Sequence, residues 1–332
     1  MAAAKRYPTQ GFAGYNVAWS PFFPDRLAVA SSANVCSGSV LTIKYGLVGN
    51  GRLHLFGATP AQTKIYDTQD GIFDIAWSEI HENQIASACG DGSIKLWDAS
   101  LNDHPIRNWT EHGREVFSLD WNNIQKDLFA SSSWDGLVKI WHPERPASIQ
   151  TIQAHGACVY KCAWSPHNPT LLATASADGS AHIFDTRQVG RPVSTMSVGG
   201  EVLALDWNKY RPMTLATGGT DRSIKVWEAR GQGESMVPET CVMVGHQYAI
   251  RGVAWSPHKP DIVASASYDM TARIWSTEGA GVAAQVPMVN QPRQVYTGHR
   301  EFVVGIAWSL FEPGMIATTS WDMETHVWPA MV

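Results

Sequence analysis

The segment Val116-Phe117-Ser118-Leu119-Asp120-Trp121-Asn122 ends in a tryptophan followed by a small polar residue, and this ending recurs along the whole chain. The copies are Trp19-Ser20, Trp77-Ser78, Trp121-Asn122, Trp164-Ser165, Trp207-Asn208, Trp255-Ser256 and Trp308-Ser309. Successive tryptophans are 58, 44, 43, 43, 48 and 53 residues apart. A sustained period of about 40 to 45 residues is typical of proteins in which each repeat is one small sheet. The period therefore predicts a single repetitive body, although 332 residues alone would favour two domains.

The residues before each tryptophan alternate with period two, as in Phe73, Ile75 and Trp77, and this period indicates a strand. The intervening positions are mostly small or apolar, so both faces of the strand are covered, as in an inner strand of packed sheets. A turn follows the tryptophan, and a second apolar run, an Asp-bearing turn, a third strand and a less regular fourth run complete the unit. Seven such four-stranded units predict an all-β, seven-bladed β-propeller.

Three further positions keep fixed offsets within the units. The turn Asp is Asp91, Asp135, Asp178, Asp221, Asp269 or Asp322, and six residues later comes Trp97, Trp141, Phe184, Trp227, Trp275 or Trp328. Four units carry a histidine nine residues before the first tryptophan, at His112, His155, His246 and His299. These residues resemble the WD-repeat family, whose His, Ser/Thr, Trp and Asp form a hydrogen-bonded network inside each blade. We therefore interpret the His and Asp residues as a structural network, which specifies one arrangement of the core, and not as catalytic dyads.

The repeats predict blades at residues 13–68, 69–112, 113–155, 156–198, 199–246, 247–299 and 300–332. The last unit has three strands, so we expect the stretch from Tyr7 to Phe12, within residues 1–12, to supply its fourth strand and remove the open edges. Blade one lacks the turn Asp and the matching Trp, and Leu41-Thr42-Ile43 followed by residues 53–56 stands in their place. Residues 57–67 and 276–293 look inserted, and the second insertion is expected between strands three and four of blade six.

Composition and motifs argue against several classes of function. The net charge is -5 and there is no run of Lys or Arg, which disfavours nucleic-acid binding. No stretch approaches 18 consecutive apolar residues, so no membrane insertion is expected. The five cysteines include no C-x-x-C pair, and no metalloprotease, hydrolase or phosphate-binding motif is present. We therefore expect no enzyme, no cofactor and no metal site, and we expect function on a surface.

One rim of the propeller carries the candidate binding residues. The His loop and the Asp turn must share this top rim because they bond to each other, whereas the turns after the tryptophans form the bottom rim. Large aromatics precede the turn Asp at Trp134, Tyr268 and Trp321, and acids precede the tryptophans by six or seven residues at Asp70, Glu115, Glu201 and Glu301. Exposed aromatics favour interfaces. The alternatives are aromatics that pad neighbouring blades, and acids that form a merely solvated rim weakened by Arg114, Arg251 and Arg300.

The likeness is closer than the generic repeat. Residues 90–98, 111–121 and 245–251 (Gly-His-Gln-Tyr-Ala-Ile-Arg), together with the atypical first blade from Gly14 to Ile43, resemble the peroxin-7 family of receptors for the type-2 peroxisomal targeting signal. The resemblance implies a receptor that captures cargo in the cytoplasm and shuttles to the peroxisome. Its cargo carries an N-terminal nonapeptide of Arg or Lys, an aliphatic residue, five variable residues, His or Gln, and Leu or Ala. A co-receptor peroxin and the peroxisomal docking machinery are the implied partners.

On a helix, positions 1, 2, 8 and 9 of this nonapeptide share a basic and apolar face. We expect Asp70, Glu115 and neighbouring acids to bind its basic residues, while aromatics face its aliphatic residues or the co-receptor. The expected peptide-binding residues are Asp70, Asp74, Glu115, Phe117, Trp134, Tyr160, Glu201, Tyr248, Arg251, Tyr268, Glu301 and Trp321. The alternative is a WD-repeat scaffold for another basic peptide, such as a histone-tail or ubiquitin-ligase adaptor, which should ignore the nonapeptide.

Overall fold

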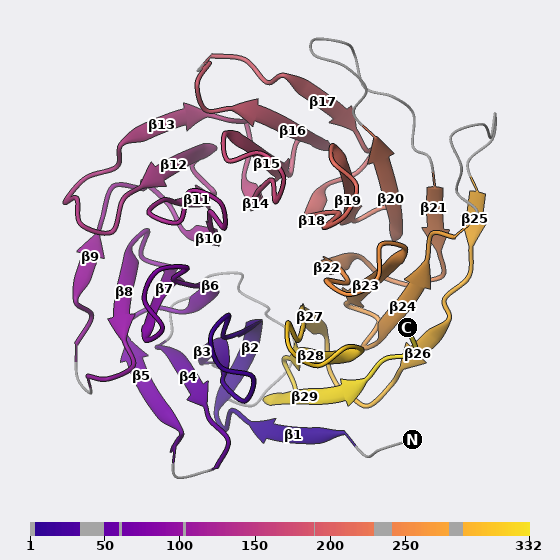
Figure 1. Cartoon of the computed structure of the whole chain (residues 1–332), viewed down its shortest axis with the longest axis horizontal. Helices are drawn as coiled ribbons and strands as arrows, with labels where there is room; N and C mark the ends of the chain where they lie inside the picture. Colours follow the sequence, from indigo (N-terminus) through magenta and orange to yellow (C-terminus); the bar gives the residue numbers. More distant parts are fainter. Residues whose placement is uncertain are drawn as a thin grey trace, which may run out of the picture.

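Seven small sheets, antiparallel except for one parallel outer strand, are arranged around a central axis like the blades of a propeller (Figure 1). This computed structural model describes residues 4–33, 50–59, 62–101, 104–188, 190–228, 241–278 and 288–332. No helix within these ranges is long and apolar enough to cross a membrane. The predicted seven-bladed β-propeller is confirmed, and each repeat tryptophan ends the innermost strand of its blade.

The first three blades each contain four strands in sequence order from the axis outward. Blade one consists of β2 (Phe12–Trp19), β3 (Leu27–Ala33), β4 (Gly51–Phe56) and β5 (Lys64–Thr68). Blade two consists of β6 (Ile72–Trp77), β7 (Gln84–Cys89), β8 (Ile94–Asp98) and β9 (Arg107–Trp109). Blade three consists of β10 (Val116–Trp121), β11 (Phe129–Ser133), β12 (Leu137–Trp141) and β13 (Gln150–Gln153).

The remaining blades follow the same plan, except that blade five has a fifth outer strand and the outer strand of blade seven comes from the N-terminus. Blade four has β14 (Val159–Trp164), β15 (Leu171–Ser176), β16 (Ser180–Asp185) and β17 (Ser194–Ser197). Blade five has β18 (Val202–Trp207), β19 (Thr214–Gly219), β20 (Ser223–Glu228), β21 (Cys241–Val244) and the added β25 (Met288–Asn290). Blade six has β22 (Ile250–Trp255), β23 (Ile262–Ser267), β24 (Ala272–Ser276) and β26 (Gln294–Tyr296). Blade seven joins β27 (Val303–Trp308), β28 (Met315–Ser320) and β29 (Glu324–Pro329) to the N-terminal β1 (Lys5–Pro8).

The N-terminal strand closes the ring, as the incomplete last repeat predicts. β1 pairs antiparallel with β29, with Lys5 opposite Val327 and Pro8 opposite Glu324. The strand lies slightly earlier than expected, because Phe12 already begins the inner strand of blade one. The Tyr7 ring packs at a tilt against Phe56 of blade one, with ring centroids 5.0 Å apart, so the closing strand also contacts the first blade.

The hydrophobic core lies between the blades. Each buried cluster combines residues of adjacent blades; one of them joins Leu53 and Leu55 of blade one to Ile72 and Ile85 of blade two. Four of the seven repeat tryptophans also bond across these junctions, because their indole N–H donates to the carbonyl just before the tryptophan of the preceding blade. The donors and acceptors are Trp19 and Ala307 at 3.3 Å, Trp77 and Ala18 at 3.2 Å, Trp207 and Ala163 at 2.9 Å, and Trp308 and Ala254 at 3.0 Å. The Trp121 indole instead donates to Lys126 of its own blade, and those of Trp164 and Trp255 have no acceptor among the described residues. At four junctions the tryptophan that marks the repeat thus also forms a hydrogen bond between neighbouring blades.

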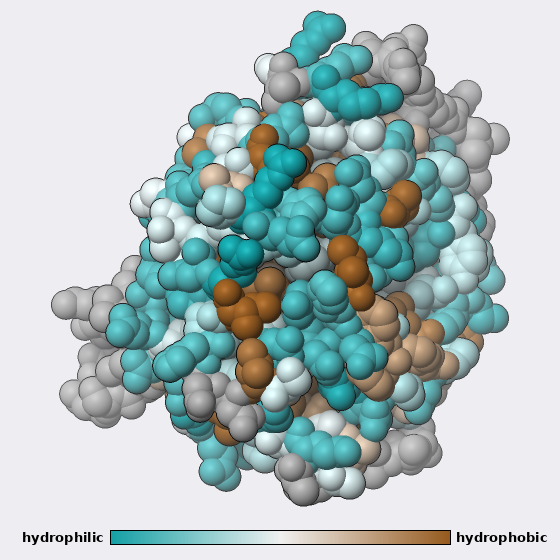
Figure 2. All heavy atoms as spheres, turned by 60° about the vertical axis from the view of Figure 1, so that its left-hand side comes forward, coloured by the Kyte–Doolittle hydropathy of each residue, from teal (hydrophilic) through white to brown (hydrophobic). Residues whose placement is uncertain are grey.

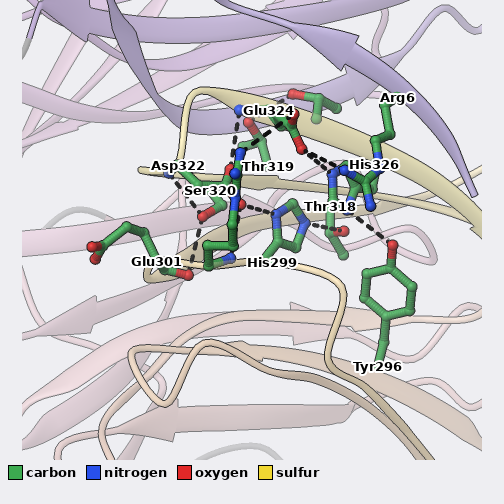
Figure 3. Close-up of polar contacts among 12 residues, drawn as sticks. Arg6, Tyr296, His299, Glu301, Thr318, Thr319, Ser320, Asp322, Glu324 and His326 are labelled. Carbon is green, nitrogen blue, oxygen red and sulfur yellow. Dashed lines mark hydrogen bonds and ion pairs between the residues drawn. The ribbon is translucent and has the colours of Figure 1, made fainter.

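The predicted His–Asp network is present in the four blades that carry both residues. In blade seven, His299 Nδ1 lies 3.0 Å from Asp322 Oδ2 and its Nε2 lies 2.9 Å from Thr318 Oγ1, which also accepts from the Trp328 indole at 3.1 Å (Figure 3). Equivalent His–Asp contacts of 2.8 to 2.9 Å occur at His112–Asp135, His155–Asp178 and His246–Asp269. The network ties the inner loop of each blade to its third strand.

Of the two expected insertions, the first needs correction and the second contains an additional strand. Residues 57–67 are not an insertion, because Lys64–Thr68 forms the fourth strand of blade one and pairs with β4. The third strand of that blade is Gly51–Phe56, while the expected segment 41–43 lies outside the described residues. The 276–293 segment does separate the third and fourth strands of blade six, but its residues Met288–Asn290 cross over and pair in parallel with β21 of blade five. The sequence pattern did not predict this pairing.

Deletion of residues 1–8 should lower the melting temperature by about 5–10 °C and promote aggregation. The deletion removes the β1–β29 ladder and the Tyr7–Phe56 contact, which leaves the outer edge of blade seven open. Differential scanning calorimetry and sedimentation measure the two effects, with Arg6→Ala as the control because its side chain is 58% exposed. An unchanged melting temperature would refute closure by this strand.

The network also predicts a dependence of stability on pH. Burial, reinforced by the adjacent His182 ring at 4.2 Å, lowers the pKa of His155 to about 4, although Asp178 opposes the shift. Because the folded pKa lies below the unfolded value of about 6.5, this contribution is fully present above pH 6.5 and is lost as the pH falls through about 4.

We expect the free energy of unfolding to fall by up to about 3 kcal/mol across this window from His155 alone. Urea denaturation measures the free energy of unfolding. Between pH 7 and pH 4, this free energy should change less with pH for His155→Gln than for the wild type. His81→Gln changes an exposed histidine and should leave the wild-type slope. Identical slopes for His155→Gln and the wild type would contradict the assignment.

Candidate functional site

A β-bulge interrupts the inner strand of every blade at the same position, four residues before the tryptophan. The unpaired residues are Tyr15, Phe73, Phe117, Tyr160, Leu203, Arg251 and Val304. A bulge redirects the side chain of its extra residue and increases the local twist of the strand. Because the bulges lie at the top-rim end of the inner strands, the redirected side chains gather at the upper mouth of the central channel.

The bulged aromatics form a continuous layer with aromatics of the neighbouring turns. Ring centroids are 5.2 Å apart for Tyr15 and Phe73, 4.9 Å for Phe73 and Phe117, and 5.2 Å for Phe117 and Trp134. The same layer continues from Tyr15 to Trp321 at 5.7 Å. We call it the aromatic floor: Tyr15, Phe73, Phe117, Trp134, Tyr160, Tyr268, Phe302 and Trp321. Each pair adds about 0.5–1.5 kcal/mol beyond its buried area, so the floor is a firm apolar platform.

Below the floor the channel offers little room. The cavity there has a volume of about 60 Å³ and is lined by Asn16, Asp74, Lys161 and Val253, among others. Such a volume holds about two water molecules. This volume is too small for a helix, so we expect a peptide on the top rim to lie across the floor.

Asp74 is part of the channel wall. It is 2% exposed, and its carboxylate contacts Lys161 Nζ at 3.0 Å, the Leu119 N–H at 3.0 Å and the amide of Asn16. A buried carboxylate with all these partners has little capacity left for a ligand. We therefore revise the expectation that Asp74 binds peptide: it joins the inner strands of blades one to four below the floor.

Acids border the floor at separate points. Burial, followed by the nearby carboxylates of Asp91 and Glu115, raises the pKa of Asp70, which places these three acids close together. Two cations lie beside these three acids: Arg114 is 3.5 Å from Glu115, and Lys95 is 3.2 Å from Asp91. The charge of Lys95 lowers the pKa of Asp70 and so opposes the effect of the two neighbouring acids. The structure thus brings the predicted Asp70 and Glu115 into one acidic corner at blades two and three.

The other predicted acids stand apart from this corner. Glu201 is exposed beside the floor, and the Tyr160 hydroxyl donates to its Oε2 over 3.5 Å. Burial, followed by the charge of Glu201, raises the pKa of Tyr160 to about 12, so this hydroxyl stays protonated as a donor. Glu301 is exposed on blade seven, where its carbonyl oxygen accepts from Ser320 (Figure 3).

The remaining predicted residues have distinct places. Arg251 lies over the Phe117 ring, with its guanidinium carbon 4.7 Å from the centroid, and donates to the Leu203 carbonyl at 3.0 Å. It is a cation set into the aromatic floor. Tyr248 is 63% exposed on the loop that follows His246, outside the floor.

Three floor residues, Tyr15, Phe73 and Phe302, are absent from the site expected from the sequence. Tyr15 and Phe73 share the offset of Phe117 and Tyr160, four residues before the tryptophan, so an alignment of the repeats contains the signal. Burial raises the pKa of Tyr15 to about 12, which keeps its hydroxyl protonated within the floor. Phe302 keeps no such offset, and only its contacts with Tyr268 at 5.0 Å and Trp321 at 5.3 Å place it there.

Comparison with known proteins agrees with this architecture. The family described as WD domain, G-beta repeat matches residues 61–98, 103–142 and 290–329, and the family described as EIPR1 beta-propeller matches residues 144–275. The chain is 45% identical over 115 residues to the Peroxisomal targeting signal 2 receptor of Komagataella phaffii, which covers 33% of this chain and 28% of the relative.

Two further relatives show matches of similar length. Peroxisome biogenesis protein 7 of Arabidopsis thaliana is 40% identical over 112 residues, 32% of each chain. The Peroxisomal targeting signal 2 receptor of Homo sapiens is 34% identical over 117 residues, 34% of this chain and 33% of the relative. The match thus spans about a third of the length of these relatives. The chain is a seven-bladed β-propeller whose residues 61–98, 103–142 and 290–329 match the WD repeat, and over about a third of its length it is similar to peroxisomal targeting signal 2 receptors.

Proposed function

We propose that this protein is an import receptor that binds the type-2 peroxisomal targeting signal of cargo proteins on its top rim. The observation that carries the proposal is the aromatic floor with the acidic corner of Asp70 and Glu115 at its edge. The apolar floor and the carboxylates at its edge together complement a helix that carries aliphatic and basic residues on one face. The similarity to proteins named peroxisomal targeting signal 2 receptors supports the same ligand.

The signal helix would lie across the mouth of the channel. Its aliphatic residues would pack on Phe117, Trp134 and Trp321, which are rigid, low-entropy contacts of the kind enriched at binding hot spots. The buried indole N–H groups of Trp134 and Trp321 have no acceptor among the described residues, so a carbonyl of the bound segment reached by a small side-chain shift would satisfy them. The position-1 Arg or Lys would face Asp70 and Glu115, and acids on such a rim act mainly through steering and selectivity.

The role proposed here is binding and transport, not catalysis. Part of the top rim would remain uncovered by a nonapeptide, including Tyr248 and the exposed Glu301. We propose that a co-receptor peroxin covers this remainder, holds the cargo in place, and connects the complex to the peroxisomal docking machinery. The receptor would load in the cytoplasm and shuttle to the peroxisome.

Glu115→Lys should weaken binding of the nonapeptide about tenfold or more, because it reverses one charge of the acidic corner. Fluorescence anisotropy with a labelled nonapeptide measures the affinity, at two salt concentrations because the effect should shrink at high salt. Glu144→Lys makes the same charge change at an exposed bottom-rim position and serves as the matched control.

A peptide with Ala in place of the position-1 Arg should bind Glu115→Lys and wild type equally. Equal binding of the unmodified nonapeptide to both proteins would contradict the proposed pairing of its basic residue with Glu115. A histone-tail peptide that outcompetes the nonapeptide would favour the adaptor alternative.

Trp321→Ala should weaken the same nonapeptide by about tenfold or more through loss of apolar contact, and this loss should persist at high salt. Tyr210→Ala removes a large aromatic that is 48% exposed on the bottom rim and controls for general effects of truncation. Circular dichroism melting checks that both variants fold. If Trp321→Ala bound the nonapeptide with wild-type affinity, the assignment of the aromatic floor to the binding site would be wrong.

A further inference from the structure

The bottom rim divides into two unlike halves at one repeat position, three residues after each inner tryptophan. The residues there are Phe22, Ile80, Ile124, His167, Tyr210, His258 and Phe311 in blades one to seven. Because the seven turns are equivalent, the role of the residue at this position can be compared from blade to blade.

In blades four to six this position bonds to the next blade. His167 Nε2 lies 3.1 Å from the Asn208 carbonyl, and His258 Nε2 lies 3.1 Å from the Ser309 carbonyl. The Tyr210 hydroxyl donates to the Pro257 carbonyl at 2.7 Å. The side chain therefore has a structural duty in this half: it joins neighbouring turns.

In blades seven, one, two and three the same position is apolar and exposed. Phe311, Phe22, Ile80 and Ile124 are 45%, 38%, 46% and 44% exposed, and Leu310 beside Phe311 is 48% exposed. We call these five residues the apolar arc. Figure 2, in which the side of blades two and three comes forward, shows brown apolar groups exposed on a largely hydrophilic surface.

The apolar arc is not needed to hold its turns together. Arg26 of blade one donates to Asn83 of blade two at 3.0 Å, and Lys126 of blade three lies 3.7 Å from Glu79 of blade two. Other residues thus make the contacts that the histidines and Tyr210 make in the opposite half. Exposed apolar side chains without an intramolecular duty, grouped on adjacent blades, are typical of a docking surface.

The centre of the apolar arc is concave, and at its border the carboxylates outnumber the cations of Arg26 and Lys126. Phe22 and Ile80 line an open hollow of about 320 Å³, with Glu82 and Asp98 on its wall. Asp25 and Glu312 are exposed in the turns of blades one and seven. Within the described ranges, the carboxylates of Asp25, Glu82 and Glu312 make no hydrogen bond or ion pair.

We propose that the apolar arc binds a partner protein through an amphipathic helix that carries aliphatic and basic residues. Aliphatic side chains at helical spacing would enter the hollow and cover the apolar arc, while Lys or Arg beside them would pair with Glu82, Asp25 and Glu312. The acidic border disfavours an anionic lipid surface, which would be repelled. It equally disfavours a second copy of this chain, because a symmetric contact would place the same acids opposite each other. The site is independent of ligand binding at the top rim.

The test uses the full chain and a labelled amphipathic peptide of about 14 Leu and Lys residues at helical spacing. An excess of the unlabelled targeting nonapeptide is present throughout to occupy the top rim. We expect saturable binding, weakened at least about tenfold by Phe22→Ser with Ile80→Ser, and also by Glu82→Lys. A matched peptide with Glu in place of Lys should bind at least about tenfold more weakly than the Lys peptide.

Ile65→Ser is the matched control, because Ile65 is 47% exposed on the outer strand of blade one, away from the apolar arc. It should leave the affinity unchanged, and all variants should melt within about 2 °C of the wild type because the changed side chains are exposed. Equal binding of the wild type and the Phe22→Ser, Ile80→Ser protein would overturn the proposal.

Three further results would also overturn it: equal binding of the Glu peptide, flotation with anionic vesicles in place of peptide binding, and a wild-type dimer in sedimentation that the double variant abolishes. The last two would assign the apolar arc to a membrane or to self-association.

Discussion

Every blade depends on its neighbours for a hydrophobic core, so the ring must close before any part of it is fully stable. The buried clusters lie at the junctions, and tryptophan indoles bond from one blade to the main chain of the preceding one. In such an array, stability is approximately a sum of contributions from adjacent units. The pairing of β1 with β29 joins the two ends of the chain in blade seven and completes the last junction. Closure thereby fixes the width of the channel and the position of everything at its mouth.

The same framework gives the two rims different characters. At the top, a bulge repeated in each inner strand presents one side chain per blade to the channel mouth, and four of these side chains are aromatic. At the bottom, one turn position hydrogen-bonds to the next blade in blades four to six and is an exposed apolar residue without such a bond in the other four. In both cases the backbone is constant and the identity of one residue decides whether the position supports the ring or meets a partner.

The sequence was sufficient for the fold because the tryptophan spacing, the strand alternation and the fixed His–Asp offsets all reflect local, repeated geometry. It also located Trp134, Tyr268 and Trp321, which keep a fixed offset from the turn Asp. It did not predict the bulges, because a bulge has no composition of its own and the aromatic before it fits an ordinary strand pattern. It misjudged Asp74, whose burial follows from the approach of Lys161 from two blades away. It also missed β25, because a three-residue strand in another blade has no local signal.

The crossover of Met288–Asn290 makes one junction of the ring unlike the others. Blades five and six share a main-chain ladder at their outer edge, since β25 belongs to the chain of blade six and pairs with β21 of blade five. Two units tied in this way should open together, so their amides would exchange with solvent as one cooperative block. Local opening of the ring would then begin at a junction between other blades. The amides of blades five and six would exchange most slowly, because these two blades share a main-chain ladder.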